Sequence, residues 1–342
     1  TGGGCPHILA EPQRTNLVPE SEDFSAWTYS NSTLANSTTV VNPSGESSSG
    51  LFSVTSGSSN KFSYISVTTT SNLHSYSIFV KYSDVQFIQL AGGGNTSYAN
   101  FDVQNGVLGN TNANSSIESF GNGWYKCIMT STSSETFSNT AVVIIDALTS
   151  ARLSSTSEVG SVYIWGAQLE VGSYATSYIP TSGSTVTRNQ DIFTRDGIGS
   201  LINSTEGVLF VEMAALANDG TYRTLSISDG TTANRVAIRY KSSVNEMQVF
   251  VVALGGTQVI LTKTGLTITD FNKIAIKWKL NDFSFWIGGV KIDTDLSGSV
   301  PVGINSLNFN NGVNTNDFFG KVKQLQVYTT ALSDTQLAAL TT

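Results

Sequence analysis

Short runs of β-branched and aromatic residues, bounded by Gly, Asn and Ser, recur along the whole chain. The run of residues 273–280 alternates, with its large apolar side chains at one set of positions and its lysines at the other: Ile274, Ile276, Trp278 and Leu280 against Lys273, Lys277 and Lys279. Because successive side chains of a strand point to opposite faces, this pattern predicts a strand with one face in a core and one in water.

Comparable runs occur in both halves of the chain. In the first half they include residues 75–82, 87–90, 141–146 and 161–170, and in the second half 207–216, 224–230, 235–241, 247–254, 258–263, 282–289 and 321–329. Turn-rich tracts at residues 91–97 and 105–116 separate some of them. This spacing predicts an all-β protein made of antiparallel β-sandwich domains.

The C-terminus is the exception to the strand pattern. Ser333 followed by Gln336 predicts a capping box, which starts a short helix. Leu337 and Leu340 would then face the domain.

Length and composition limit the number of domains and the classes of binding partner. The 342 residues suffice for two domains, and a change to Pro, Gly, Ser and Thr near residues 177–191 marks the boundary. We therefore expect a lead-in segment (1–15), a first domain (16–181), a linker (182–205) and a second domain (206–342). The net charge of −7 argues against nucleic-acid binding, and no apolar run approaches the ~20 residues of a membrane span.

Several separated motifs in the first half occur in a recognisable order. They are GCPHILAEPQRTNLVPESEDFSAW (4–27), GNGWYKC (121–127), GSVYIWGAQLEVGS (160–173) and SYIPT (177–181). Together they resemble a jelly-roll module, akin to carbohydrate-binding modules, that recurs in bacteriophage tail-fibre, head-fibre and related virion adhesion proteins. In those proteins a GGGCP segment lies inside a longer chain, so the resemblance implies an upstream region that attaches to the particle.

Two segments of the second half resemble a concanavalin A-like jelly roll of the laminin-G and pentraxin type. They are FNKIAIKWKLNDFSFWIGGVKI (271–292) and FFGKVKQLQVYTTALSDTQLAAL (318–340). The resemblance implies two paired strands joined by a tight turn, then a last strand and a short helix. It indicates a fold and not a function, because this fold hosts lectins, enzymes and structural domains.

Residues suited to catalysis are few. Glycoside hydrolysis needs two carboxyl groups on either side of the scissile bond, and Asp293 and Asp295 are the nearest approach to such a pair. We expect them to be exposed loop aspartates. The two histidines, His7 and His74, lie near no nucleophile motif, so a hydrolytic triad is not expected.

The sequence leaves more than one state possible for the two cysteines and for a metal site. Cys5 and Cys127 are expected as free thiols, with a single bridge as the alternative. The resemblance implies a structural calcium site near the first strand, where Glu22 and Asp23 stand. Related modules add an Asp near the last strand, where this chain has Gln168 and Glu170.

Sugar binding by such modules uses aromatic rings stacked on pyranose faces, with amides nearby for the hydroxyl groups. Tyr98, flanked by Asn95 and Asn100 in a turn-rich segment, is the predicted carbohydrate-binding loop. The tryptophans of the recurring strand motifs are instead expected in the core: Trp27, Trp124, Trp165 and Trp278.

These observations predict a non-catalytic protein of the virion surface, outside the cell, that attaches to bacterial surface polysaccharide. Other virion proteins are the expected partners, and the resemblance implies a homotrimer. Two alternatives remain: a purely structural decoration or spacer domain, and a polysaccharide-degrading enzyme.

Overall fold

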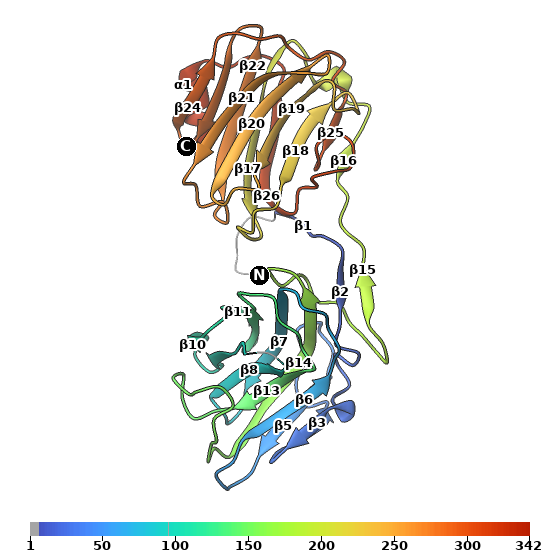
Figure 1. Cartoon of the computed structure of the whole chain (residues 1–342), viewed down its shortest axis with the longest axis vertical. Coiled ribbons are helices and arrows are strands. Elements are labelled where there is room, and N and C mark those ends of the chain that lie inside the picture. The colour runs from blue at the N-terminus through green and yellow to red at the C-terminus, as the bar shows by residue number, and fades with distance from the viewer. Residues whose placement is uncertain (1–6, 95) are drawn as a thin grey trace. The chain divides into compact units, whose positions relative to one another are not determined.

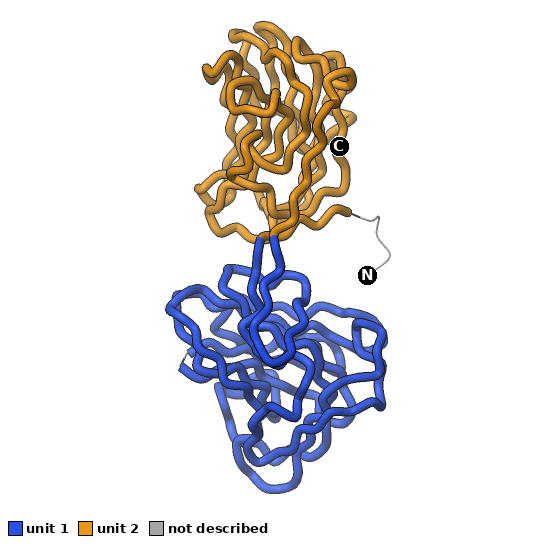
Figure 2. The backbone as a smooth tube through the Cα atoms, turned by 90° about the vertical axis from the view of Figure 1, so that its right-hand side faces the viewer, with its two compact units in different colours: residues 1–2, 13–189 blue, residues 3–12, 190–342 orange. Residues whose placement is uncertain are grey.

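The computed structural model describes residues 7–94 and 96–342. The chain divides into two compact units, which are coloured separately in Figure 2. The first unit is Gln13–Asn189, and the second is Gln190–Thr342 together with the described part of Gly3–Pro12.

Two antiparallel sheets of six strands form the first unit (Figure 1). In spatial order the first sheet is β10 (Val107–Thr111), β9 (Ala99–Asp102), β8 (Phe87–Gly93), β13 (Asn139–Ile144), β6 (Lys61–Ser66) and β3 (Thr28–Ser30). The second is β11 (Asn114–Gly121), β12 (Trp124–Thr130), β7 (His74–Tyr82), β14 (Gly160–Val171), β5 (Ser49–Val54) and β4 (Thr33–Ser37). A short ribbon pairs β2 (Arg14–Asn16) with β15 (Val186–Arg188), and a 3-10 turn, η1, covers Phe24–Ala26.

The core of the first unit lies between its two sheets. Alternate side chains of β7 and β8 meet there, including Tyr76, Ile78, Ile88 and Leu90, all fully buried. Residues 105–116, expected as turns, instead contain β10 and the start of β11. The polar Asn and Thr side chains of this stretch are mostly exposed on edge strands, so no apolar alternation marks them in the sequence.

Two further sheets of six strands form the second unit. One has the order β1 (Ile8–Ala10), β26 (Gly320–Tyr328), β17 (Glu206–Ala215), β22 (Asn272–Lys279), β23 (Phe283–Ile287) and β24 (Val290–Asp295). The other is β16 (Thr194–Arg195), β25 (Ser306–Asn308), β18 (Arg223–Ser228), β19 (Arg235–Tyr240), β20 (Glu246–Ala253) and β21 (Gly256–Thr264). The 3-10 turn η2 covers Gly199–Leu201, and the helix α1 covers Asp334–Thr341.

The predicted all-β fold class is confirmed, as is the capped C-terminal helix. Ser333 caps α1 in a complete capping box with Gln336, and Leu337 is fully buried. Leu340 packs against the same apolar cluster. The four tryptophans expected in the core are each at most 3% exposed.

The prediction for residues 273–280 is wrong in two details. Leu280 follows the end of β22 in a turn and is exposed, because Asn281 takes the positive φ of a tight connection to β23. Lys277 is not in water but only 7% exposed, and its Nζ lies 2.6 Å from the Asp282 carboxylate. The reason is that α1 packs on this outer face, over Ala275.

Each unit pairs a strand from the N-terminal segment with a strand from a distant part of the chain. β1 pairs with β26 of the second unit, whereas β2, four residues later, pairs with β15 of the first. The N-terminal segment therefore contributes a strand to each unit.

Candidate functional site

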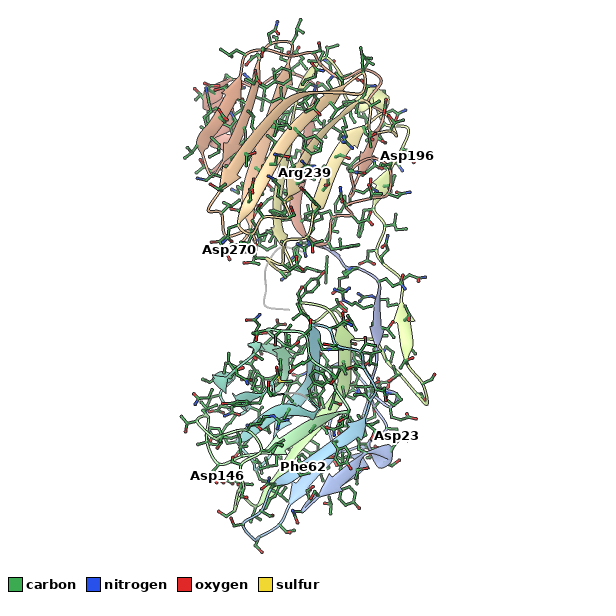
Figure 3. All side chains as sticks on the ribbon, in the orientation of Figure 1. Asp23, Phe62, Asp146, Asp196, Arg239 and Asp270 are labelled. Atoms are coloured by element: carbon green, nitrogen blue, oxygen red, sulfur yellow. The ribbon has the colours of Figure 1, made fainter. Side chains whose placement is uncertain are left out.

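Aromatic side chains line the outer face of the sheet that contains β8 and β13. We call the partly buried rings of Phe62, Tyr64, Phe87 and Tyr98 the aromatic face. They pack on a buried apolar cluster of β8 and β13 and of the residue after β13, formed by Ala91, Ala141, Val143 and Ile145. Figure 3 labels Phe62 on β6, and Asp146 where β13 gives way to a loop.

Strand register places two tyrosines at the ends of one row. Ala141 of β13 is paired with Tyr64 of β6 on one side and with Ala91 of β8 on the other. Leu90 pairs with Ala99, so Tyr98 lies across from Ala91. At about 4.8 Å per strand, three strand spacings separate the two tyrosines by about 14 Å. Two small side chains thus lie between two rings.

Hydrogen bonds fix the backbone of Tyr98. Its N–H donates to Oδ1 of Asn112 at 2.8 Å, and its carbonyl accepts from the Thr111 hydroxyl at 2.9 Å. A ring whose backbone is already held in place loses less conformational freedom when a ligand stacks on it.

The loop after β13 is anchored on this sheet by two buried amides. Nδ2 of Asn100 donates to the carbonyls of Leu148 and Ser150, at 3.0 and 2.7 Å. Oε1 of Gln89 accepts from the Leu153 N–H at 2.8 Å. Leu153 has a φ of 53°, a left-handed conformation that costs a branched residue about 1–3 kcal/mol and that these bonds hold.

A cation lies at the border of the aromatic face. Nη2 of Arg152 donates to the carbonyl of Gly92, the residue after Ala91. Burial lowers the pKa of Arg152, and the charge of Glu135 opposes that shift. The face therefore combines aromatic rings, buried amides and one guanidinium.

Of the three residues predicted to bind sugar, the structure describes Tyr98 and Asn100. Tyr98 is part of the aromatic face and directly precedes β9. Asn100 is fully buried, and its amide anchors the loop instead of lying at the surface. Asn95 lies outside the described residues. That any of them binds sugar stays a prediction.

Glu22 and Asp23 lie at an open cleft of about 490 Å³, together with Glu20. Oδ1 of Asp23 accepts from the hydroxyl and the N–H of Ser25 and from Nδ2 of Asn36. These bonds, that from the Ser25 hydroxyl above all, lower the pKa of Asp23. Oε1 of Glu22 accepts from the Tyr178 hydroxyl at 2.8 Å.

Calcium requires six to eight oxygen ligands around one point. Within residues 7–94 and 96–342, no group of three or more His, Cys, Asp or Glu side chains could hold a metal ion. Glu170 is buried and accepts from the Thr176 N–H at 2.9 Å, so it holds its own loop. A calcium site at Glu22 and Asp23 stays a prediction, and nothing below depends on a metal.

The acidic residues and the histidine considered for catalysis interact with their own neighbours in the chain. Asp293 and Asp295 lie on the edge strand β24, not in a loop, and Oδ1 of Asp295 accepts from the Ser297 N–H. His74 is fully buried, with Nδ1 3.0 Å from the Asn72 carbonyl. Cys127 is a buried free thiol, and Cys5 lies outside the described residues.

Sequence reasoning missed Phe62, Phe87 and Gln89. Phe62 could have been found from its spacing of two from Tyr64, which puts both rings on one side of β6. Gln89 gives no such signal, since its role depends on a loop more than fifty residues away.

No family model matches the sequence, and no curated protein matches it either. Among solved structures, the Ruminococcus gnavus IT-sialidase CBM40 bound to α2,3-sialyllactose is 16% identical, covering 44% of this chain and 98% of its own, with a TM-score of 0.37. Mouse laminin α1 domains LG4-5 are 8% identical, covering 97% of this chain and 94% of theirs, with a TM-score of 0.29. Sheep galectin-11 is 7% identical, covering 40% of this chain and 97% of its own, with a TM-score of 0.28. These likenesses are too low to carry an argument about function.

Among the described helices, none has the length and apolar character needed to cross a bilayer.

Proposed function

We propose that this chain is a non-catalytic adhesion protein whose first unit binds glycans through the aromatic face. The observation that carries the proposal is the row from Tyr64 through Ala141 and Ala91 to Tyr98. The alanines between the two rings are buried, and Leu153 packs on the same cluster, so a sugar would stack on the exposed part of each ring. Each ring can pack there on the apolar face of a pyranose. Arg152, which donates to the Gly92 carbonyl, adds a cationic group at the border of this face.

The biological setting is also a proposal. The motifs of the first half support a bacteriophage virion protein that contacts bacterial surface polysaccharide outside the cell, with other virion proteins as partners. The expected domains are residues 16–181 and 206–342, joined by a linker at 182–205 and preceded by a lead-in at 1–15. A homotrimer would present several weak sites at once, which raises the overall affinity through avidity.

The test is a titration of the full chain against an array of bacterial capsular and surface polysaccharides. Tyr64→Ala and Tyr98→Ala are expected to weaken binding about tenfold each, which corresponds to about 1.4 kcal/mol. Tyr29→Ala is the matched control, because Tyr29 is 51% exposed in the same sheet but paired with the inward-facing Ser63.

Two outcomes would replace the proposal. A folded wild-type chain that binds no glycan on the array would favour the spacer alternative. Release of reducing sugar from any polysaccharide would favour the degrading enzyme.

A further inference from the structure

The second unit carries two arginines on the outer face of the sheet that contains β18 to β21. These four strands lie side by side in Figure 1. Arg235 and Arg239 alternate along β19 with Val236, Ile238 and Tyr240, which enter the core. Both arginines therefore point away from the core, on the side of Ala237. Figure 3 labels Arg239 on this sheet.

Both guanidinium groups lie over one aromatic ring. The Cζ atoms of Arg239 and Arg235 are 4.5 and 5.1 Å from the centroid of Phe250. Arg239 is also 5.2 Å from the ring of Tyr222. Phe250 forms, with Ala237 and Val252, a small buried apolar cluster on this outer face. Two like charges are thus brought together over an apolar floor.

Neither arginine has a carboxylate partner in the part of the chain that the structure describes. Nε of Arg239 donates to Oε1 of Gln248 at 2.9 Å, and Nη1 of Arg235 donates to the Asn311 carbonyl at 2.6 Å. Nε of Arg235 is buried with no hydrogen-bond partner. Several guanidinium hydrogens, including those on Nη1 of Arg239, are left over.

Burial and like charge both act against the charged forms of this pair in the free protein. Burial lowers the pKa of both arginines, and the charge of Arg239 lowers that of Arg235 further. The chain has 25 acidic residues against 18 Lys and Arg. Even so, none of the described carboxylates pairs with either of these two arginines. An anion bound between the two groups would relieve the repulsion, and a planar carboxylate matches the fork of an arginine.

We propose that Arg235 and Arg239 form a binding site for the carboxylate of an acidic sugar. The sugar ring would lie over the apolar floor toward Ile260, which is 51% exposed and paired with Phe250 on β21. In the adjacent row Gln248 is buried and links Arg239 to the Thr262 hydroxyl, and the partly exposed Thr262 adds a hydroxyl group beside the sugar. The site lies on the face of the sheet and not along the backbone of its edge strand β21, where an added peptide strand would pair.

The site is independent of the aromatic face, because it lies in the other unit. The test measures binding of the full chain to oligosaccharides of galacturonate, glucuronate, mannuronate and sialic acid. Each acidic ligand is paired with its methyl ester, which keeps the ring and removes the charge. Sulfated dextran, inorganic phosphate and an Asp-rich peptide complete the set of probes.

At least one acidic sugar is expected to bind more than tenfold tighter than its methyl ester. Arg239→Gln and Arg235→Gln should each remove most of that difference, whereas Arg195→Gln, an exposed arginine of β16 in the same unit, should not change it. Tyr98→Ala should leave this binding intact, so loss of the aromatic-face site and loss of the arginine site are distinguishable.

Three results would overturn the inference. The first is that none of the four acidic sugars binds. The second is that sulfated dextran or phosphate binds as tightly, with Arg195→Gln as harmful as the other two variants, which indicates general charge attraction. The third is that the peptide binds in place of the sugars.

Discussion

Gln89 and Asn100 lie opposite each other on β8 and β9, and Nε2 of Gln89 donates to Oδ1 of Asn100 at 2.7 Å. The same Nε2 donates to the Ala151 carbonyl, and Nδ2 of Asn100 donates to the carbonyls of Leu148 and Ser150. Oε1 of Gln89 accepts from the Leu153 N–H, so the pair holds the loop after β13. Two amides therefore fix the segment that carries Arg152 to the border of the aromatic face.

Asn100→Ala is expected to lower the free energy of unfolding by about 2 kcal/mol. The variant removes the hydrogen bond to the Ser150 carbonyl and one bond each from the Leu148 carbonyl and the Gln89 amide. A buried polar group left without a partner costs about 1–3 kcal/mol. Denaturant unfolding gives the stability, and hydrogen exchange should show faster exchange in residues 146–158. Asn110→Ala is the control, because Asn110 is exposed on the neighbouring strand β10. Equal stability of the two variants would contradict this role.

The stability of the first unit should fall as the pH drops below about 6.5. Burial lowers the pKa of His74, although the Asn72 carbonyl and the charge of Glu135 act against this shift. The unfolded chain then binds a proton below its ordinary pKa of about 6.5 that the folded chain does not, which costs stability at up to about 1.4 kcal/mol per pH unit. The slope between pH 6.5 and 5.5 should vanish in His74→Gln. A variant with the wild-type slope would show that another group is responsible.

Asp282→Asn is expected to destabilise the second unit by about 1–2 kcal/mol. The substitution leaves the ammonium group of Lys277, whose side chain is only 9% exposed, without its partner. Adding Lys277→Met to that variant should restore most of the loss, since it removes the buried charge. A double-mutant cycle by denaturant unfolding measures the coupling. Additive effects of the two substitutions would mean that the pair contributes nothing.

Ser333→Ala should lower the stability of the second unit by about 1 kcal/mol. The Ser333 hydroxyl and the Gln336 side chain satisfy backbone N–H groups at the start of α1 in a reciprocal manner. Thr335→Ala, exposed in the same first turn, should be close to neutral. Thermal unfolding of the full chain compares the two. A neutral Ser333→Ala would indicate that packing of Leu337 alone holds the helix.

Cys127 should resist alkylation in the folded protein. Burial raises the pKa of this thiol, so little of the reactive thiolate exists near neutral pH, and its side chain is closed to reagents. In a Cys5→Ser background, labelling by iodoacetamide should appear only with unfolding. Rapid labelling under native conditions would mean that β12 opens locally.

The strands could be predicted from the sequence because most alternate between apolar and polar residues, but β6 shows the limit of that signal. Its large rings, Phe62 and Tyr64, face outward, whereas Lys61 and Ser63 are buried. Nζ of Lys61 is satisfied by the carbonyls of Thr55 and Glu158, which lie far apart in the chain. Alternation gives two faces without saying which one is the core, so the aromatic face and the arginine site required the structure.

The crossing of the chain at residues 12–13 and again at 189–190 has a practical consequence for dissecting the protein. A fragment that begins at Gln190 would lack Ile8–Ala10 and leave one side of β26 bare, with unpaired N–H and C=O groups open to pairing with another copy. Such a fragment would be prone to aggregate for a reason unrelated to its ligand. Isolating the second unit calls for residues 7–12 to be rejoined to it, for instance by circular permutation.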